Sequence, residues 1–258
     1  MAHWVRFTRD GATGFGTLDG ETIAVHEGDM FAAASTSGES CALADVTLLT
    51  PCAPGKIIAL WNNSRSAAEK QGLSQPEYPL YFIKAPNSYL APGGTIRKPA
   101  SYDGRVIYEA ELGIVIGKTC ANADQNAAAD AIFGYTCVND VTALQLLNAD
   151  PSFPQWARAK GFDTFGAFGP AIVTDADISG STIRAELNGR ERQNYPVSDL
   201  MMQPAEIVAR LSESMTLHPG DLIACGTGPG ALPMKPGATI DIIIDGVGTL
   251  SNTYEDPA

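Results

Sequence analysis

The sequence predicts a β-rich α+β protein with a large mixed domain and a small N-terminal β appendage. Short strand-like runs outnumber helical segments, and turn dipeptides such as Asp10-Gly11, Asn188-Gly189 and Asp245-Gly246 recur along the chain. Strands and helices do not alternate as they would in a doubly wound sheet. With 258 residues, of which 45% are hydrophobic and 18% charged, the chain is long enough to bury a sizeable core.

Residues 1–50 form the predicted appendage. Three strand-like runs are separated by Asp-Gly turns, and they cover residues 4–7, 14–18 and 22–26. Pro51, Pro54 and Gly55 follow, and such residues mark a boundary between structural units. We therefore expect the main domain to span residues 54–258.

The main domain is expected to open with a buried strand at 56–61 and a helix at 64–71, which Gly72 ends. Further strands are predicted at 78–84, 108–117, 134–141, 183–187, 222–225, 239–244 and 247–250. Further helices are predicted at 123–132, 142–148 and 204–214, the last with Pro204 at its first position.

Charge and composition exclude several classes of partner. The net charge of −12, from 17 basic and 29 acidic residues, would repel nucleic acid and anionic membrane surfaces. No apolar run approaches the length of a membrane span, and the first residues lack the apolar core of a signal peptide. The five cysteines form no CxxC pair, which is typical of reduced thiols. We therefore expect a cytoplasmic protein.

Two glutamates on the predicted strand 108–117 are the strongest chemical signal. Residues two apart on a strand point to the same face, so Glu109 and Glu111 would stand side by side and repel each other. A divalent cation held by oxygen ligands would offset that repulsion. Asp140, at the end of the strand 134–141, supplies a third carboxylate, and such a set suits Mg²⁺ or Mn²⁺. Solvated rim carboxylates and a purely structural Ca²⁺ site are the alternatives.

Several segments, in order along the chain, resemble the fumarylacetoacetate hydrolase family. Residues 108–117 resemble its EXE metal motif, and the other similar segments are 134–141, 159–170, 188–193 and 217–227. The resemblance runs from about Lys56 to Tyr254. It implies a mixed β-roll or sandwich around a Mg²⁺ or Mn²⁺ site, usually in a homodimer. It also implies a small-molecule 2-oxo acid as substrate.

The resemblance also implies roles for individual residues. It makes Glu109, Glu111 and Asp140 the metal ligands and Lys160 the active-site lysine. Gly226 and Thr227 resemble the cradle of the substrate carboxylate, although this chain continues with Gly-Pro-Gly where many relatives have Thr-Pro. Gln193 is expected to add a polar contact.

One position departs from the family pattern. Hydrolytic members carry a His-x-x-Glu dyad that activates water, and here Ser66 stands where the histidine would be, while Glu69 is present. Glu69 is therefore the expected catalytic base. The nominal activity is hydrolysis of a C–C bond in an acylpyruvate-like acid, in aromatic or sugar-acid catabolism. The alternatives are an isomerase, tautomerase or decarboxylase acting on a hydroxymuconate- or oxaloacetate-like diacid, and a non-catalytic protein that binds 2-oxo acids.

Overall fold

The computed structural model describes residues 1–256 and confirms the β-rich α+β architecture. Its helices are α1 (Arg65–Gln71), α2 (Gln125–Ala131), α3 (Trp156–Lys160) and α4 (Pro204–Ser214). Its strands are β1 (Ala2–Arg9), β2 (Ala12–Asp19), β3 (Thr22–Asp29), β4 (Ala33–Ala42), β5 (Thr47–Leu48), β6 (Ile57–Trp61), β7 (Leu80–Lys84), β8 (Tyr89–Leu90), β9 (Thr95–Arg97), β10 (Val106–Ile107), β11 (Ala110–Ile116), β12 (Ile132–Asp140), β13 (Thr142–Ala143), β14 (Gly166–Thr174), β15 (Thr182–Leu187), β16 (Arg190–Pro196), β17 (Leu222–Ala224), β18 (Ala238–Ile244) and β19 (Gly248–Glu255).

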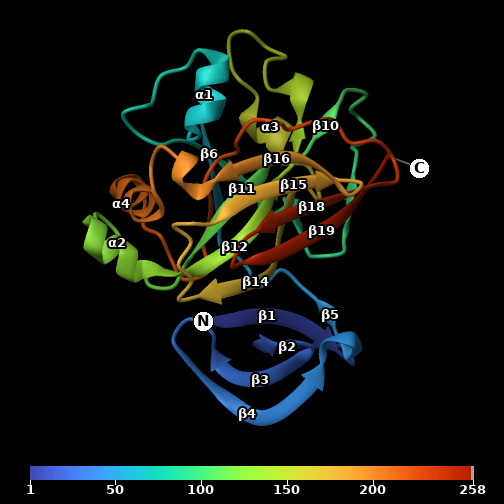
Figure 1. Ribbon diagram of the computed structural model, residues 1–258, viewed down its shortest axis with the longest axis vertical. Helices are drawn as coiled ribbons and strands as arrows, with labels where there is room; N and C mark the ends of the chain where they lie inside the picture. Colours follow the sequence, from blue (N-terminus) through green and yellow to red (C-terminus); the bar gives the residue numbers. More distant parts are fainter. Residues whose placement is uncertain (257–258) are drawn as a thin grey trace.

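Two large sheets and a small two-stranded sheet, β10-β13, build the main domain, and the larger sheet continues into the appendage (Figure 1). The larger sheet has 12 strands, with the order β4-β3-β2-β1-β14-β12-β11-β17-β6-β7 and with β5 and β8 paired to β1 and β14. The smaller sheet has the order β16-β15-β18-β19-β9. Apolar side chains of both sheets share one core, for example Leu112 of β11 with Ile183 and Ile242 of β15 and β18. This shared core holds the two sheets face to face.

The larger sheet curls within the main domain. β7 is the last strand in the sheet order, yet β8, the next strand along the chain, pairs in parallel with β14. The side chain of Lys84 at the end of β7 also reaches Asp140 at the end of β12. The strands from β14 to β7 therefore form a roll whose two sides meet at these strand ends.

The N-terminal appendage is joined to this sheet by strand pairing. Its three predicted strands lie within β1, β2 and β3, and a further strand, β4, covers a small and polar stretch for which no strand was predicted. Ala2 to Trp4 of β1 pair antiparallel with Ile172 to Thr174 of β14. The appendage has its own small core around Val5, Phe7 and Ile23. Figure 1 shows it below the main domain, in blue.

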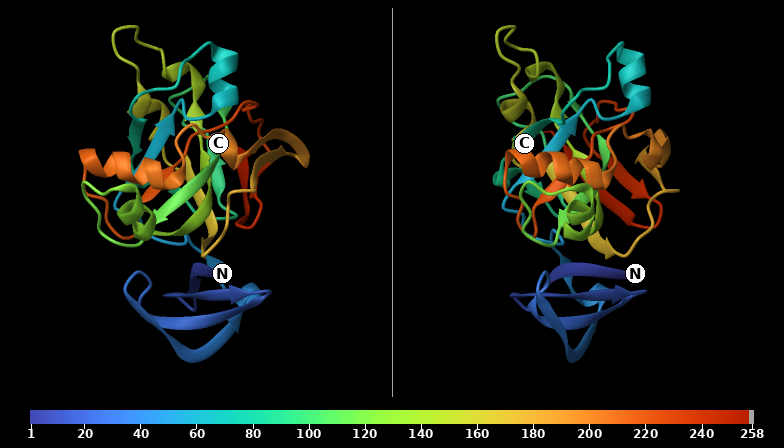
Figure 2. Two further views of the ribbon diagram at one scale, coloured as in Figure 1. Left: turned by 60° about the vertical axis from the view of Figure 1, so that its left-hand side comes forward. Right: turned by 90° about the vertical axis from the view of Figure 1, so that its left-hand side faces the viewer.

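Some sequence-based predictions for the main domain were wrong. The helix predicted at 142–148 is replaced by β13 and a single 3₁₀ turn at Leu144–Leu146, because Thr142 and Ala143 pair with β10. Strands β14 and β16 and helix α3 were not predicted. α2 and α4 lie side by side on one flank of the main domain, as Figure 2 shows, and the backbone amide of Ala123 donates to Ser212 Oγ there (2.9 Å).

Helices α1 and α3 lie at the end of the main domain farthest from the appendage (Figures 1 and 2). The start of β11 and the end of β12 are at this end as well. Within residues 1–256, no helix is both long and apolar enough to cross a membrane. The end with α1 and α3 is where the carboxylates predicted from the sequence come together.

Candidate active site

Strand register brings the three predicted carboxylates together. In the antiparallel pair of β11 and β12, Glu111 lies opposite Val138, and the amide of Asp140 donates to the carbonyl of Glu109 (3.0 Å). Residues directly opposite each other on antiparallel strands share a face, so Asp140 lies on the face of Glu109 and Glu111. One carboxylate oxygen from each residue lies within 4.8 Å of the others. We call Glu109, Glu111 and Asp140 the acid cluster.

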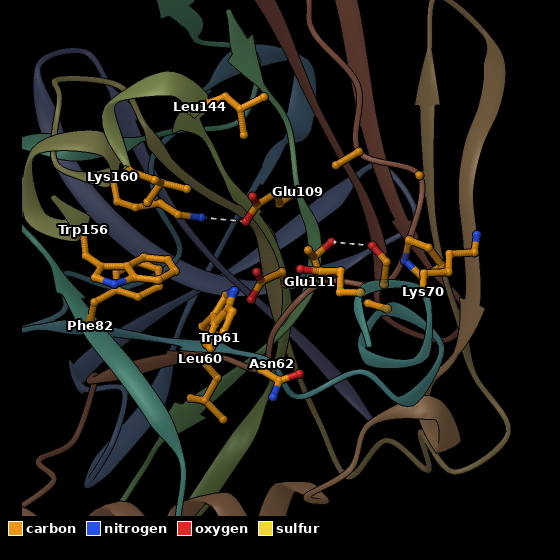
Figure 3. A pocket seen from close by; sticks show the side chains of 18 residues that line it. Leu60, Trp61, Asn62, Lys70, Phe82, Glu109, Glu111, Leu144, Trp156 and Lys160 are labelled. Atoms are coloured by element: carbon orange, nitrogen blue, oxygen red, sulfur yellow. Dashed lines mark hydrogen bonds and ion pairs between the residues drawn. The ribbon is translucent and has the colours of Figure 1, made fainter. Parts of the chain in front are cut away.

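Lys160 joins two members of the acid cluster. Its Nζ lies 2.6 Å from Glu109 Oε2 (Figure 3) and 2.5 Å from Asp140 Oδ2. Lys160 is the last residue of α3 and is only 2% exposed. The structure therefore brings the lysine implied by the family resemblance into direct contact with two of the implied metal ligands.

Lys84 belongs to the same network and was missed in the sequence. Its Nζ lies 2.5 Å from Asp140 Oδ1 and 2.6 Å from the carbonyl oxygen of Lys160, and the residue is fully buried. Lys84 shares the inward face of β7 with Phe82. A lysine in phase with the inward apolar residues of a strand is the signal that would have identified it.

Burial and charge shift the pKa values of this network in opposite directions. Burial, followed by the charges of Asp140 and Glu109, raises the pKa of Glu111 well above its usual range. Burial also raises the pKa of Glu109, although Lys160 opposes this. Burial has the same sense at Asp140, but the ammonium groups of Lys160 and Lys84 outweigh it and lower that pKa. The anionic forms of Glu109 and Glu111 are thus disfavoured unless a further cation is bound nearby.

The loop after β17 supports the acid cluster from the other side. The backbone amide of Gly226 donates to Glu111 Oε2 (2.7 Å). The hydroxyl of Thr227 donates to the carbonyl of Ala110 (3.0 Å) and accepts from the side-chain amide of Gln193 (2.9 Å). Gln193 is fully buried, donates also to the carbonyl of Gly228 (2.8 Å) and accepts from the amide of Ala110 (3.0 Å). Gln193 therefore fixes the loop to the strand that carries the glutamates.

The acid cluster opens into a pocket of about 380 Å³. Glu109, Glu111, Lys160 and Thr227 line it, whereas Asp140, Gln193 and Gly226 lie behind its wall. One side of the pocket is aromatic. The rings of Phe82 and Trp156 are stacked, with their centroids 5.2 Å apart and an interplanar angle of 17°. The ring centroids of Trp61 and Trp156 are 5.8 Å apart. Figure 3 shows this aromatic side beside Lys160.

Helix α1 covers another part of the pocket, but not with the residue expected. Glu69, Lys70 and Gln71 are all exposed to solvent, but only Lys70 and Gln71, together with Ala67, line the pocket. Ser66, at the position of the absent histidine, points to a different partner, because its hydroxyl donates to Asp199 Oδ2 (2.8 Å). The structure thus does not bring Glu69 to the acid cluster.

The residues present fit a divalent cation. The acid cluster offers only carboxylate oxygens, two residues being buried and Glu109 partly buried, and this is the donor set that Mg²⁺ and Mn²⁺ prefer. The ammonium of Lys160 already lies against two of these carboxylates, so the position attracts positive charge. Glu109, Glu111 and Asp140 would hold the cation.

The fold and site together define a β-roll protein with a buried three-carboxylate centre at the end of a pocket. Residues 56–255 match the family model "Fumarylacetoacetate (FAA) hydrolase C-terminal", and residues 2–51 match the model "Rv2993c-like, N-terminal". The chain belongs to the fumarylacetoacetate hydrolase family. Members of this family are enzymes that act on small molecules and typically use a divalent metal.

Relatives with named activities include isomerases as well as hydrolases. The 2-hydroxyhepta-2,4-diene-1,7-dioate isomerase from Mycobacterium marinum is 35% identical, with a TM-score of 0.91 and 100% of both chains covered. The oxaloacetate tautomerase YisK of Bacillus subtilis is 35% identical over 224 residues, which are 81% of this chain and 73% of YisK. The maleylpyruvate hydrolase from Sphingobium sp. SYK-6 is 27% identical, with a TM-score of 0.81 and 100% of both chains covered.

Proposed function

We propose that this chain is a divalent-metal-dependent isomerase or tautomerase of a small 2-oxo or enol acid. The observation that carries the proposal is the acid cluster with Lys160 at the end of a pocket that no histidine lines. Proton transfer next to an oxo group needs a stabilised enolate but no activated water. The named isomerase and tautomerase relatives support the same reading.

Different residues of the site would have different roles in the proposed reaction. Glu109, Glu111 and Asp140 would hold a cation, which would supply Lewis acidity for enolate formation. Lys160 lines the pocket and adds a positive charge beside the reacting oxygen atoms. Thr227, held by its contacts with Ala110 and Gln193, presents a fixed wall to the substrate carboxylate. Phe82, Trp61 and Trp156 exclude water from one side, which strengthens these electrostatic interactions.

The proton carrier predicted from the sequence is Glu69. Because Lys70 and Gln71 line the pocket and Glu69 does not, transfer by Glu69 requires a movement of α1. A Glu69→Gln variant tests this role: it should slow exchange of the substrate C3 protons with deuterated solvent while leaving ligand binding in place. Unchanged exchange would assign the proton transfer to water or to another group.

Hydrolysis of a C–C bond is the second candidate. The maleylpyruvate hydrolase relative favours it, and the cavity of about 380 Å³ has room for a small acylpyruvate. Glu111→Ala should abolish both isomerisation and hydrolysis, because it removes one of the three carboxylates.

The sequence-based expectations of a cytoplasmic location and a homodimer also stay predictions.

Proton NMR with two substrates separates the candidates. The protein is incubated with oxaloacetate and with acetopyruvate, each with Mg²⁺ or Mn²⁺ and again with EDTA. Faster metal-dependent enol–keto exchange of oxaloacetate, with acetopyruvate intact, supports the tautomerase. Metal-dependent formation of acetate and pyruvate would instead make the chain a hydrolase, and pyruvate from oxaloacetate would make it a decarboxylase. If neither substrate changes or binds, the proposal is wrong.

A further inference from the structure

The pocket contains one positive charge that the proposed chemistry does not use. Lys70 lies in the last turn of α1 and lines the pocket (Figure 3). Lys160, the other lysine of the lining, is paired with two carboxylates. Lys70 has no carboxylate within ion-pair distance among residues 1–256. Lys70 is exposed to solvent, and its ammonium is therefore free to meet an anion that enters the pocket.

The charges at the other end of the pocket account for only one substrate carboxylate. When all groups are ionised, the three carboxylates of the acid cluster and the two ammonium groups of Lys84 and Lys160 carry a net charge of −1. A divalent cation changes this net charge to +1. That single positive charge neutralises the carboxylate of a 2-oxo monoacid. A second carboxylate on the same substrate needs another cation, and Lys70 is the unpaired one in the lining.

The lining outside the charged groups is suited to a flat carbon chain. Phe82 and Trp156 present stacked rings, Trp61 lies beside them, and Leu144 and Leu147 add aliphatic surface. Aromatic faces favour planar π-systems, such as those of an enol or a conjugated diene acid. In Figure 3 this aromatic side and Lys70 lie on opposite sides of Glu109 and Glu111, so a ligand held at the acid cluster would lie between them.

Contacts at the start of α1 hold the helix that carries Lys70. Asp199 accepts hydrogen bonds from the amide and hydroxyl of Ser66 (3.1 and 2.8 Å), and from the hydroxyl of Ser64 (2.5 Å). The guanidinium of Arg65 donates to the carbonyls of Ser198 and Leu200 (2.9 and 2.7 Å). These contacts tie the first turn of α1 to residues 198–200, so the last turn is presented to the pocket without further ordering of the helix.

We propose that Lys70 binds the second carboxylate of a planar 2-oxo or enol dicarboxylate, and thereby selects diacids over monoacids. This inference rests on the proposed function, since it assumes that the 2-oxo acid end of the ligand meets the acid cluster. It assigns to α1 a specificity-determining residue in place of the absent histidine.

Ligand binding, rather than turnover, tests the proposal. Dissociation constants are measured in Mg²⁺ by calorimetry and by fluorescence of Trp61 and Trp156, for pairs of equal chain length: 2-oxoglutarate with 2-oxovalerate, and 2-oxoadipate with 2-oxohexanoate. The wild type should bind at least one diacid about tenfold more tightly than its monoacid partner. Lys70→Met should bring that ratio close to one, and Lys70→Glu should invert it.

A matched control is Lys118→Met, which removes the same charge from an exposed lysine outside the pocket and should keep the ratio of the wild type. If the wild type binds monoacids and diacids equally, or if Lys70→Met keeps the preference, Lys70 does not bind the second carboxylate. The proposed function is not affected by that outcome. If no 2-oxo acid binds with metal present, the proposed function fails and this inference fails with it.

Discussion

Lys84 and Asp140 form an ion pair that solvent does not reach. The distance from Lys84 Nζ to Asp140 Oδ1 is 2.5 Å, and the two side chains are 0% and 1% exposed. The other oxygen of Asp140 accepts from Lys160. Asp140 is therefore held by two ammonium groups, and its orientation relative to Glu109 and Glu111 is set before any metal binds.

Lys84→Met is expected to destabilise the protein. The variant keeps the volume of the side chain but removes one of the two cations that compensate a buried carboxylate, and such losses cost about 3–5 kcal/mol. Urea unfolding in EDTA measures the free energy of unfolding. Lys118→Met, at an exposed lysine, should change it by less than about 0.5 kcal/mol. A Lys84→Met protein as stable as the wild type would show that this ion pair adds nothing to the fold.

Metal binding should stabilise the folded protein. At a free Mg²⁺ or Mn²⁺ concentration of about 100 times the dissociation constant, the gain is about 2.7 kcal/mol. For a chain of this size that gain corresponds to a rise in Tm of about 5–10 °C. EDTA should reverse the rise, and Glu111→Gln should abolish most of it because a ligand carboxylate is lost. The control Glu191→Gln changes an exposed acid outside the pocket and should keep the full shift.

The strands that carry the ligands could be predicted from the sequence because the information is local. The spacing of Glu109 and Glu111 and the position of Asp140 at the end of a strand need no knowledge of the rest of the fold. Lys84 is different: it is 56 residues from Asp140, and they meet because the large sheet curls. Strand patterning says which side chains point inward, but not which distant strand ends come together.

The position of Glu69 relative to the pocket could not be predicted from the sequence for a related reason. A helix at 64–71 was predicted and α1 spans Arg65–Gln71, but its rotation depends on contacts with residues 198–200. Those contacts turn Lys70 and Gln71 to the pocket and leave Glu69 outside its lining. Amphipathic spacing cannot fix this rotation, because the residues of this short helix are mostly polar or small.

The stability of the metal-free protein should depend on pH through Glu111. Burial, followed by the charges of Asp140 and Glu109, raises the pKa of Glu111 in the folded protein above its unfolded value of about 4.3. The folded state thus holds this proton more tightly. The stabilising contribution is complete below the unfolded pKa and is lost as the pH rises through the folded pKa.

Glu111→Gln isolates this effect, because the neutral amide still offers an oxygen to the backbone amide of Gly226. In EDTA the variant should be more stable than the wild type, and the difference in the free energy of unfolding should widen as the pH rises from 5 to 8. Urea unfolding at several pH values measures that difference. Parallel profiles for the two proteins would mean that Glu111 ionises in the folded state as easily as in the unfolded chain.

Asp199 is expected to control the order of α1 and, through it, the pocket. Asp199→Ala removes the acceptor of three hydrogen bonds from Ser64 and Ser66, a loss similar to that of a helix cap and costing about 1–2 kcal/mol locally. Amide hydrogen exchange of residues 65–71 should accelerate, and 2-oxo diacids should bind more weakly because α1 must be ordered on binding. Ser66→Ala removes only one of these bonds and should have a smaller effect of the same sign. If Asp199→Ala leaves both exchange and affinity unchanged, Arg65 alone is enough to hold the helix against residues 198–200.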